Sequence, residues 1–206
     1  MEREKQDRRT RKTRQLLRST LLGLLKEKRY EDISVQDIIE RADVARSTFY
    51  THYVDKDDLL TGQHGVFAEN LGEHIQAHSQ REDDGSASSL GTMFSVRTWF
   101  YHVQAQGPIL KLIAKDSALD LAMKTLHRIV QRSVEESLQA HLQAEKDIDI
   151  PASVLVDYVT GSLMILIQWW FKQGMTKTPE QMDALFQQLV IPGVSSVFHK
   201  TTHEFR

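Results

Sequence analysis

Apolar residues recur at helical spacing along most of the chain, and no stretch alternates apolar and polar positions as a half-buried strand would. One face of a helix expected over residues 10–28 carries Leu17, Leu21, Leu24 and Leu25, and residues 1–9 precede it as a charged arm. The same spacing predicts further helices over 35–42, 46–53, 56–80, 90–105, 108–115, 117–143, 152–173 and from 179 onward, with a polar loop at 81–89. The sequence therefore predicts an all-α fold.

Residues 34–53 form a pattern of two short helices joined by a tight turn. Ser34 stands three residues before Asp37, the spacing at which a hydroxyl and a carboxylate cap a helix reciprocally. Asp43 suits the left-handed backbone of a turn, and a second helix follows from Arg46 to Tyr53. Two such helices make a helix-turn-helix, whose second helix enters the major groove of DNA.

The second of these helices is polar on its expected outer face. Phe49 and Tyr53, four residues apart, form its inward stripe. Hydroxyl, imidazole and guanidinium groups, which suit phosphate oxygens and base edges, are supplied by Arg46, Thr48, Tyr50, Thr51 and His52. The alternative interpretation is a solvated amphipathic helix within an ordinary helical bundle.

The run ADVARSTFYTHYVDKDDLL resembles the DNA-binding signature of the TetR family of bacterial one-component transcriptional regulators, and the similarity extends from about Thr10 to Leu60. The resemblance implies an N-terminal three-helix DNA-binding domain at residues 1–60 and a helical effector-binding and dimerisation domain at residues 61–206. It implies a homodimeric repressor that binds a palindromic operator in double-stranded DNA and is released or modulated by a small-molecule effector.

The resemblance also implies which side chains contact DNA. Arg46 and Thr48 would contact bases or phosphates, and Lys56 would contact a phosphate. The full expected set is Ser34, Arg46, Ser47, Thr48, Tyr50, Thr51, His52 and Lys56. The sequence departs from the family pattern at two positions, because Asp43 stands where Gly is usual and Ala45 where a Ser or Thr cap is usual.

Charge is distributed unevenly over the 206 residues, whose net charge is −2. Residues 1–60 hold 14 Lys/Arg against 12 Asp/Glu, whereas residues 61–206 hold 12 against 16. Residues 1–14 alone carry 7 basic and 3 acidic side chains. A basic N-terminus on a mildly acidic body fits a partner rich in phosphate, although solubility tails are also basic.

Composition further limits the class of protein. The absence of cysteine excludes disulfides and thiolate metal sites and fits a reducing, cytoplasmic compartment. The N-terminus is too charged for a secretory signal, and the apolar run Leu163–Ile167 is too short for a membrane span.

No catalytic motif is found in the sequence. A phosphate-binding glycine loop, GxSxG, HExxH and a dinucleotide fingerprint are all missing, so neither an enzyme nor a cofactor is expected. His74 and His78 are spaced for one helix face, but no third ligand lies near them in sequence and we expect no bound metal.

The C-terminal region offers a candidate pocket and a candidate interface. Aromatic, thioether and polar side chains that suit a small-molecule pocket, or alternatively an ordinary core, are Met93, Trp99, Phe100, His102, Met123, His127 and Gln168. The helix over residues 152–173 is apolar on nearly every face and must be covered on every face. A second subunit would supply part of that cover, through an interface predicted at Leu155, Tyr158, Ser162, Trp170, Phe186, Leu189 and Val190.

Two other functions remain open from the sequence. One is a helical protein-interaction dimer with a vestigial helix-turn-helix, which Asp43 and Ala45 favour. The other is a DNA-binding regulator that takes no small ligand.

Overall fold

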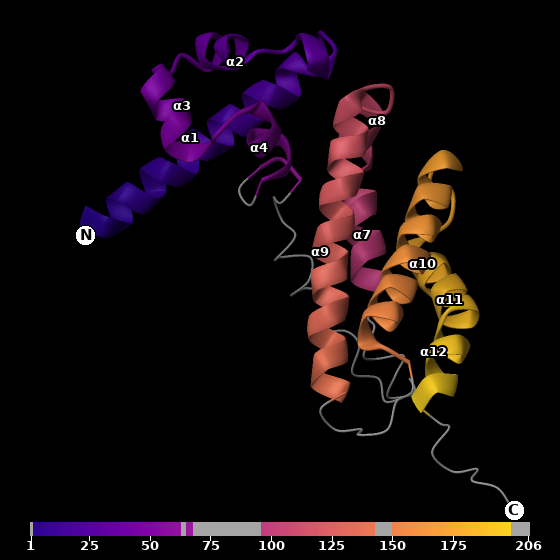
Figure 1. The fold of residues 1–206 in the computed structure, drawn as a ribbon. Coiled ribbons are helices and arrows are strands. Elements are labelled where there is room, and N and C mark those ends of the chain that lie inside the picture. Colours follow the sequence, from indigo (N-terminus) through magenta and orange to yellow (C-terminus); the bar gives the residue numbers. More distant parts are fainter. Residues whose placement is uncertain (1, 63–64, 68–95, 143–149, 199–206) are drawn as a thin grey trace, which may run out of the picture. The chain divides into compact units, whose positions relative to one another are not determined.

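The computed structural model describes residues 2–62, 65–67, 96–142 and 150–198, and every regular element in these ranges is a helix (Figure 1). The elements are α1 (Glu2–Leu24), η1 (Tyr30–Asp32), α2 (Val35–Ala42), α3 (Arg46–His52), α4 (Lys56–Thr61), α7 (Arg97–Ala105), α8 (Gly107–Leu112), α9 (Ser117–Leu142), α10 (Ala152–Lys172), α11 (Pro179–Leu189) and α12 (Ile191–Phe198). The predicted all-α fold is therefore confirmed for the described residues. Met93, His74, His78 and the expected loop at 81–89 lie outside them.

The chain packs as two compact units. The first contains α1 to α4, α8 and the first turns of α9 to Thr125, and the second contains α7, the rest of α9 from Leu126, and α10 to α12. The predicted division into functional domains at residue 60 stays a prediction.

The core of the first unit lies between its four N-terminal helices. α1 packs against α2 and α4, and α2 packs against α3. Side chains with no exposed surface come from each helix: Leu17, Leu21, Ile38, Phe49, Leu59 and Leu60. Phe49 is the contribution of α3, so the second helix of the helix-turn-helix is anchored to the unit through this ring.

The first helix is longer at its N-terminus and shorter at its C-terminus than predicted. α1 begins at Glu2, so residues 2–9 are helical and are not the expected arm. This stretch is rich in Glu, Arg and Lys, which favour helix, and it contains neither Gly nor Pro. At the other end, residues 25–27 form a turn.

The helix predicted over residues 56–80 was wrong in length, because α4 ends at Thr61. Gly62 is extended, and the chain then turns back so that Val66 N–H donates to the Leu59 carbonyl at 2.9 Å. A Cβ on Gly65 would lie 2.8 Å from that same carbonyl oxygen. The close backbone approach therefore requires glycine, and Gly62 and Gly65 lie at the end of this helix.

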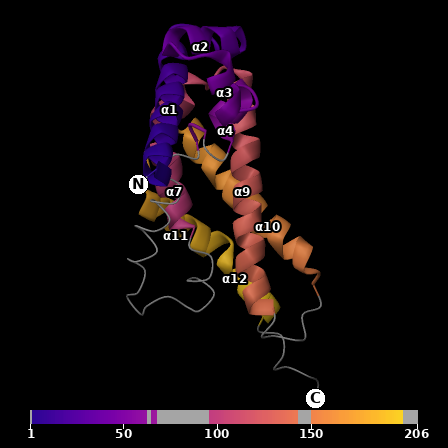
Figure 2. The same ribbon diagram turned by 90° about the vertical axis from the view of Figure 1, so that its left-hand side faces the viewer.

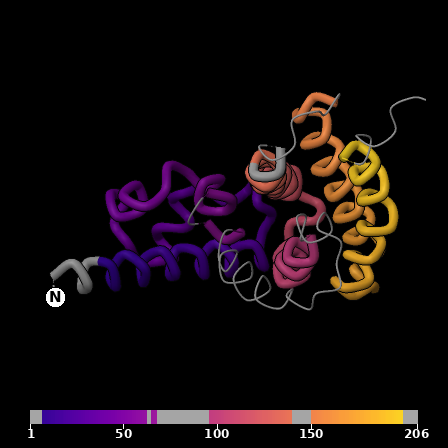
Figure 3. The backbone as a smooth tube through the Cα atoms, turned by 90° about the horizontal axis from the view of Figure 1, so that it is seen from below, coloured from indigo at the N-terminus to yellow at the C-terminus, as the bar shows by residue number. Residues whose placement is uncertain are grey.

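In the second unit, α11 contacts three other helices. α10 packs against α11, and α11 packs against α7 and α12 (Figures 1 and 3). The Phe100 ring meets the Trp170 ring edge-on with centroids 5.7 Å apart, and the Trp170 indole N–H donates to the Lys177 carbonyl at 3.0 Å. In Figure 2 the axis of α10 runs obliquely to that of α9, to which it is linked by a Gln131–Asp157 hydrogen bond of 3.3 Å.

Candidate nucleic-acid interface

The helix-turn-helix begins with a complete capping box, as predicted. Ser34 Oγ accepts from Asp37 N–H at 3.1 Å, and Asp37 Oδ2 accepts from Ser34 N–H at 2.7 Å. Lys28 Nζ lies 2.8 Å from Asp37 Oδ1. The hydrogen bonds from Lys28 and Ser34 hold the pKa of the Asp37 carboxyl well below its usual range. The cap therefore stays ionised at neutral pH, and the Ser34 hydroxyl is committed to it.

The turn between α2 and α3 has the backbone that the sequence predicted. Asp43 is left-handed, with φ 51° and ψ 50°, and its N–H donates to the Glu40 carbonyl at 3.2 Å. Val44 N–H donates to the Ile39 carbonyl at 3.1 Å. These two bonds close the C-terminus of α2, so aspartate at the usual glycine position forms the turn.

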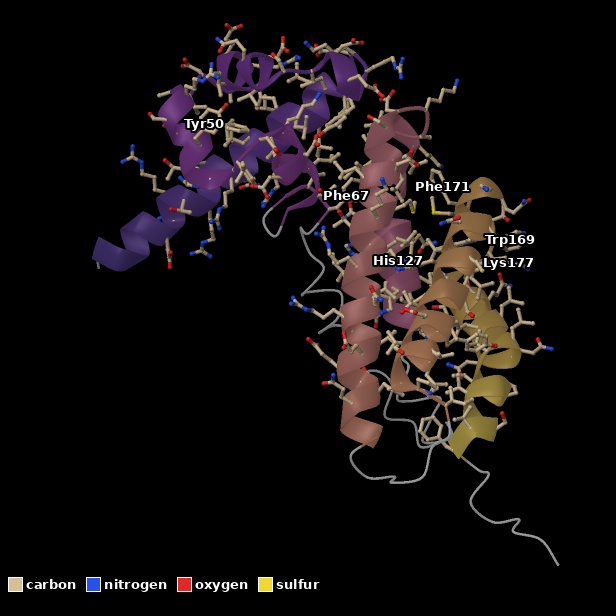
Figure 4. All side chains as sticks on the ribbon, viewed as in Figure 1. Tyr50, Phe67, His127, Trp169, Phe171 and Lys177 are labelled. Atoms are coloured by element: carbon tan, nitrogen blue, oxygen red, sulfur yellow. The ribbon has the colours of Figure 1, made fainter. Side chains whose placement is uncertain are left out.

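The outer face of α3 is polar and accessible. Arg46, Ser47, Tyr50 and Thr51 are exposed, whereas Phe49 is fully buried. The Arg46 guanidinium carbon lies 5.6 Å from the centroid of the Tyr50 ring, labelled in Figure 4. This stacked pair presents several N–H donors and one hydroxyl at the surface, the groups that hydrogen-bond to base edges and phosphates.

The remaining predicted contacts on α3 are less accessible. Thr48 and His52 are half-buried, and Thr51 Oγ1 donates to the Ser47 carbonyl at 2.8 Å. Burial, and then the positive charge of Arg14, lowers the pKa of His52. A neutral imidazole at pH 7 offers DNA a hydrogen bond and no charge. As predicted, Ala45 gives α3 no side-chain cap.

Lys56 points toward the connection between α1 and α2. Its ammonium donates to the carbonyls of Tyr30 and Ile33, each at 2.8 Å, and lies 4.4 Å from the centroid of the Tyr30 ring. The Tyr30 hydroxyl in turn donates to Asp57. The phosphate contact predicted for Lys56 stays a prediction, and it would compete with these internal bonds.

A network that the sequence did not reveal joins this connection to the start of α9. Asp116 accepts from Arg29 Nε at 3.0 Å and from Tyr30 N–H at 3.2 Å, and Ser117 N–H donates to Glu31 Oε1 at 2.9 Å. The partners are 86 or 87 residues apart, so no local pattern points to them. Beside the network lies a pocket of about 480 Å³ lined by Tyr30, Glu31, Lys56, Asp57, Ser117, Asp120, Leu121 and Lys124.

The residues predicted for an effector pocket are only partly interior. Trp99, Phe100 and His102 of α7 are buried in the second unit, whereas His127 and Gln168 are exposed. Met123 is half-buried and belongs to the first unit. One polar group missed from the sequence is the Thr160 hydroxyl, which is buried without a hydrogen-bond partner among the described residues.

The predicted dimer residues divide into two groups. Tyr158 and Leu189 are exposed and Ser162 is half-buried, so they are accessible to a second subunit. The others lie in the core of their own subunit, with 0–4% exposure: Leu155, Trp170, Phe186 and Val190. The sequence-based set is corrected to this extent, because a fully buried side chain has no surface to give to a partner.

Exposed apolar side chains on α10 form a stripe of which only Tyr158 was predicted for the interface. The stripe consists of Val154, Tyr158, Ile165 and Trp169, with exposures of 53, 46, 68 and 40%. Trp169 lies near the C-terminal end of the helix (Figure 4). Spacings of four and seven residues place the stripe along one side of α10.

In the described part of the chain, α10 is the one helix long and apolar enough to cross a membrane by length and composition. Core helices of ordinary proteins pass the same test, and 44% of its most apolar window is buried here. This is weak evidence for a span.

Comparisons with known proteins match two separate stretches of the chain. Residues 19–61 match the family described as bacterial regulatory proteins, tetR family, and residues 95–192 match a transcriptional regulator C-terminal region. A curated relative, the uncharacterized HTH-type transcriptional regulator YxbF of Bacillus subtilis (strain 168), is 44% identical over 61 residues. That match covers 29% of this chain and 16% of the relative, so the likeness is confined to a small part of YxbF.

Solved structures share the fold over nearly the whole chain. A putative TetR-family transcriptional regulator from Syntrophomonas wolfei has a TM-score of 0.55 at 16% identity, covering 94% of this chain and 99% of that one. A TetR transcriptional regulator from Streptococcus agalactiae 2603V has a TM-score of 0.52 at 24% identity, covering 90% and 97%. With a capped helix-turn-helix, an exposed polar face on α3, and family matches over both parts, the chain belongs to the TetR family of bacterial transcriptional regulators.

Proposed function

We propose that the protein is a repressor that binds a palindromic operator in DNA as a homodimer and is released by a small-molecule effector. DNA binding is supported by the outer face of α3, where the stacked side chains of Arg46 and Tyr50 are exposed while Phe49 of the same helix is buried. Because Phe49 anchors α3 to the core of the first unit, the helix presents these groups in a fixed geometry. Such a role belongs in the bacterial cytoplasm, where operator DNA lies.

The apolar stripe on α10 supports the homodimer. Val154, Tyr158, Ile165 and Trp169 follow one side of the helix, and Leu189 of α11 is exposed as well. Several large apolar side chains exposed along one side of a helix are typical of an interface rather than of isolated surface residues. In a dimer on DNA, the two α3 helices would enter successive major grooves, with centres ~34 Å apart.

Buried polar groups in the second unit support the effector. The unpartnered Thr160 hydroxyl and the buried His102 are polar groups in the mostly apolar core of the second unit, the mixture that small-molecule pockets use. An effector that changes operator affinity 100-fold needs ~2.7 kcal/mol of differential affinity between the DNA-bound and released states.

The test is selection of random duplex DNA on the purified protein at ~0.15 M salt, the range in which specific binding is distinguished from non-specific binding. We expect a palindrome with half-sites about one helical turn apart. The matched variant Ile165→Glu places a charge in the apolar stripe and should retain single half-sites only. If the wild-type protein enriched no sequence, operator binding would be contradicted and a protein partner favoured. If the Ile165→Glu variant retained the same palindrome as the wild type, the α10 interface would be contradicted.

A further inference from the structure

Four arginines form a row along one side of α1. The arginine row consists of Arg8, Arg11, Arg14 and Arg18, and its spacings of three, three and four residues place successive members on neighbouring turns. Arg9 and Lys12 add two more positive charges on the adjoining face, where Lys12 follows Arg8 by four residues, and residues 8–18 contain no Asp or Glu. This part of the helix therefore carries concentrated positive charge.

The row begins beside the recognition helix. The positive charges of Arg14 and Arg18 act on His52 and on Tyr53, the two residues at the C-terminal end of α3. From there α1 continues past α3 toward its N-terminus (Figures 1 and 3). Arg11 and Arg8 thus extend the basic surface away from the half-site that α3 would occupy.

The charges of Arg8, Arg11 and Arg14 are available to an external partner. Arg8 and Arg11 are exposed, and among the side chains that the structure describes neither pairs with a carboxylate. Arg14 Nε has no acceptor in the described part of the chain, so turning its guanidinium outward breaks no hydrogen bond at that atom. Like charges three and four residues apart destabilise an isolated helix, and a polyanion would relieve the repulsion.

We propose that the arginine row is a second DNA-binding surface, which contacts phosphates flanking the half-site read by α3. The proposal rests on the DNA-binding function proposed above. Guanidinium groups bind phosphate oxygens in a bidentate manner and carry no sequence information. Ten residues of helix extend ~15 Å, the length of roughly four base pairs, so the row would lengthen the footprint beyond the operator itself.

The experiment compares two double variants of the full chain. Arg8→Gln with Arg11→Gln removes two charges from the row, and Arg9→Gln with Lys12→Gln removes the same number of charges from the adjoining face of the helix. Each protein is titrated with two labelled duplexes that the wild type retains in selection, one trimmed to the palindrome and one with ~10 flanking base pairs on each side. The flanks thereby test binding beyond the half-sites.

We expect the flanks to strengthen binding by the wild type and by the Arg9/Lys12 variant, and to have no effect on the Arg8/Arg11 variant. The slope of log affinity against log salt should fall by roughly 2 per subunit in that variant, since each phosphate contact contributes ~0.9. Both variants should melt no earlier than the wild type, because each loses like-charge repulsion. The pair Arg8→Lys with Arg11→Lys keeps the charges and should keep the flank effect.

Three outcomes would overturn the proposal. If the wild type bound both duplexes equally, or if the two glutamine variants lost the same amount of affinity, the role proposed for the arginine row would be contradicted. Operator binding itself would still stand. If the variant with Arg8→Lys and Arg11→Lys bound the flanked duplex no more tightly than the trimmed one, a contact made through charge would be contradicted. If the wild type retained no duplex at all, the proposed function and the arginine row would fail together.

Discussion

The Arg29 guanidinium donates from Nε to Oδ1 of Asp116 at 3.0 Å, although 87 residues separate the two in sequence. The other carboxylate oxygen of Asp116 accepts from Tyr30 N–H at 3.2 Å. In the same region, the Glu31 carboxylate accepts a hydrogen bond from the backbone N–H of Ser117, which is the first residue of α9. Carboxylates thus fix the connection that precedes the helix-turn-helix to the junction of α8 and α9, within one unit.

We expect Asp116→Asn to destabilise the first unit by about 1–3 kcal/mol, because its side chain is only 7% exposed and a charge-assisted bond is replaced by an amide facing two donors. Urea unfolding by far-UV circular dichroism measures the loss. Trp99, Trp169 and Trp170 all lie in the second unit, so their fluorescence reports that unit separately. Asp120→Asn, at an exposed position in the first turn of α9, is the control, and equal midpoints for both variants would contradict the role of Asp116.

The Glu31–Ser117 bond predicts a dependence of stability on pH. The Ser117 N–H lowers the pKa of Glu31 from 4.5 to about 2 in the folded chain. A depressed folded pKa stabilises the protein above the unfolded value, and this stabilisation is lost as pH falls from about 4.5 through about 2.

Glu31→Gln keeps an oxygen acceptor and removes the titration, so its urea midpoint should fall less steeply over this pH range than that of the wild type. The effect should be largest at low ionic strength, because Glu31 is accessible to solvent. Glu40→Gln on α2 makes the same charge change and should follow the wild type. A wild-type slope in the Glu31 variant would show that the bond does not act on folding.

Arg46→Ala should weaken operator binding by ~1–3 kcal/mol and broaden the preference at one base position if the guanidinium reads a base. A uniform loss over all sequences, with a smaller salt slope, would instead identify a phosphate contact. Repeating the duplex selection with the variant distinguishes the two. Lys111→Ala removes one exposed charge from α8 and serves as the control. Unchanged binding by the Arg46 variant would contradict the assignment of α3 as the recognition helix.

Two adjacent tryptophans on α10 should respond to substitution in opposite ways. Trp170 has 0% exposure and packs on Phe100, so Trp170→Ala should cost ~3–5 kcal/mol of folding free energy. Trp169 is 40% exposed, and Trp169→Ala should leave folding nearly unchanged while weakening the dimer. Urea unfolding and sedimentation at several protein concentrations measure the two effects. A stable monomeric wild type, or a dimer unaffected by loss of Trp169, would contradict the proposed interface.

Features that depend on neighbours within four residues were predictable from the sequence. The capping box of Ser34 and Asp37, the left-handed Asp43 and the inward stripe of Phe49 and Tyr53 all appear as the sequence predicted. Each is fixed by hydrogen bonds or side-chain periodicity inside one turn of helix, where the partners are already adjacent in the chain. The helix-turn-helix and its likeness to a known family follow from such features.

Tertiary packing decided the rest. α4 ends at Thr61 because the later segment folds back onto the Leu59 carbonyl, and Lys56 turns inward because the Tyr30 and Ile33 carbonyls lie within its reach. The apolar residues of α10 look alike in sequence, yet packing against α11 buries some and leaves the stripe exposed. A helix pattern records that a face is apolar, whereas only the position of the neighbouring helix determines whether that face becomes core or an exposed surface.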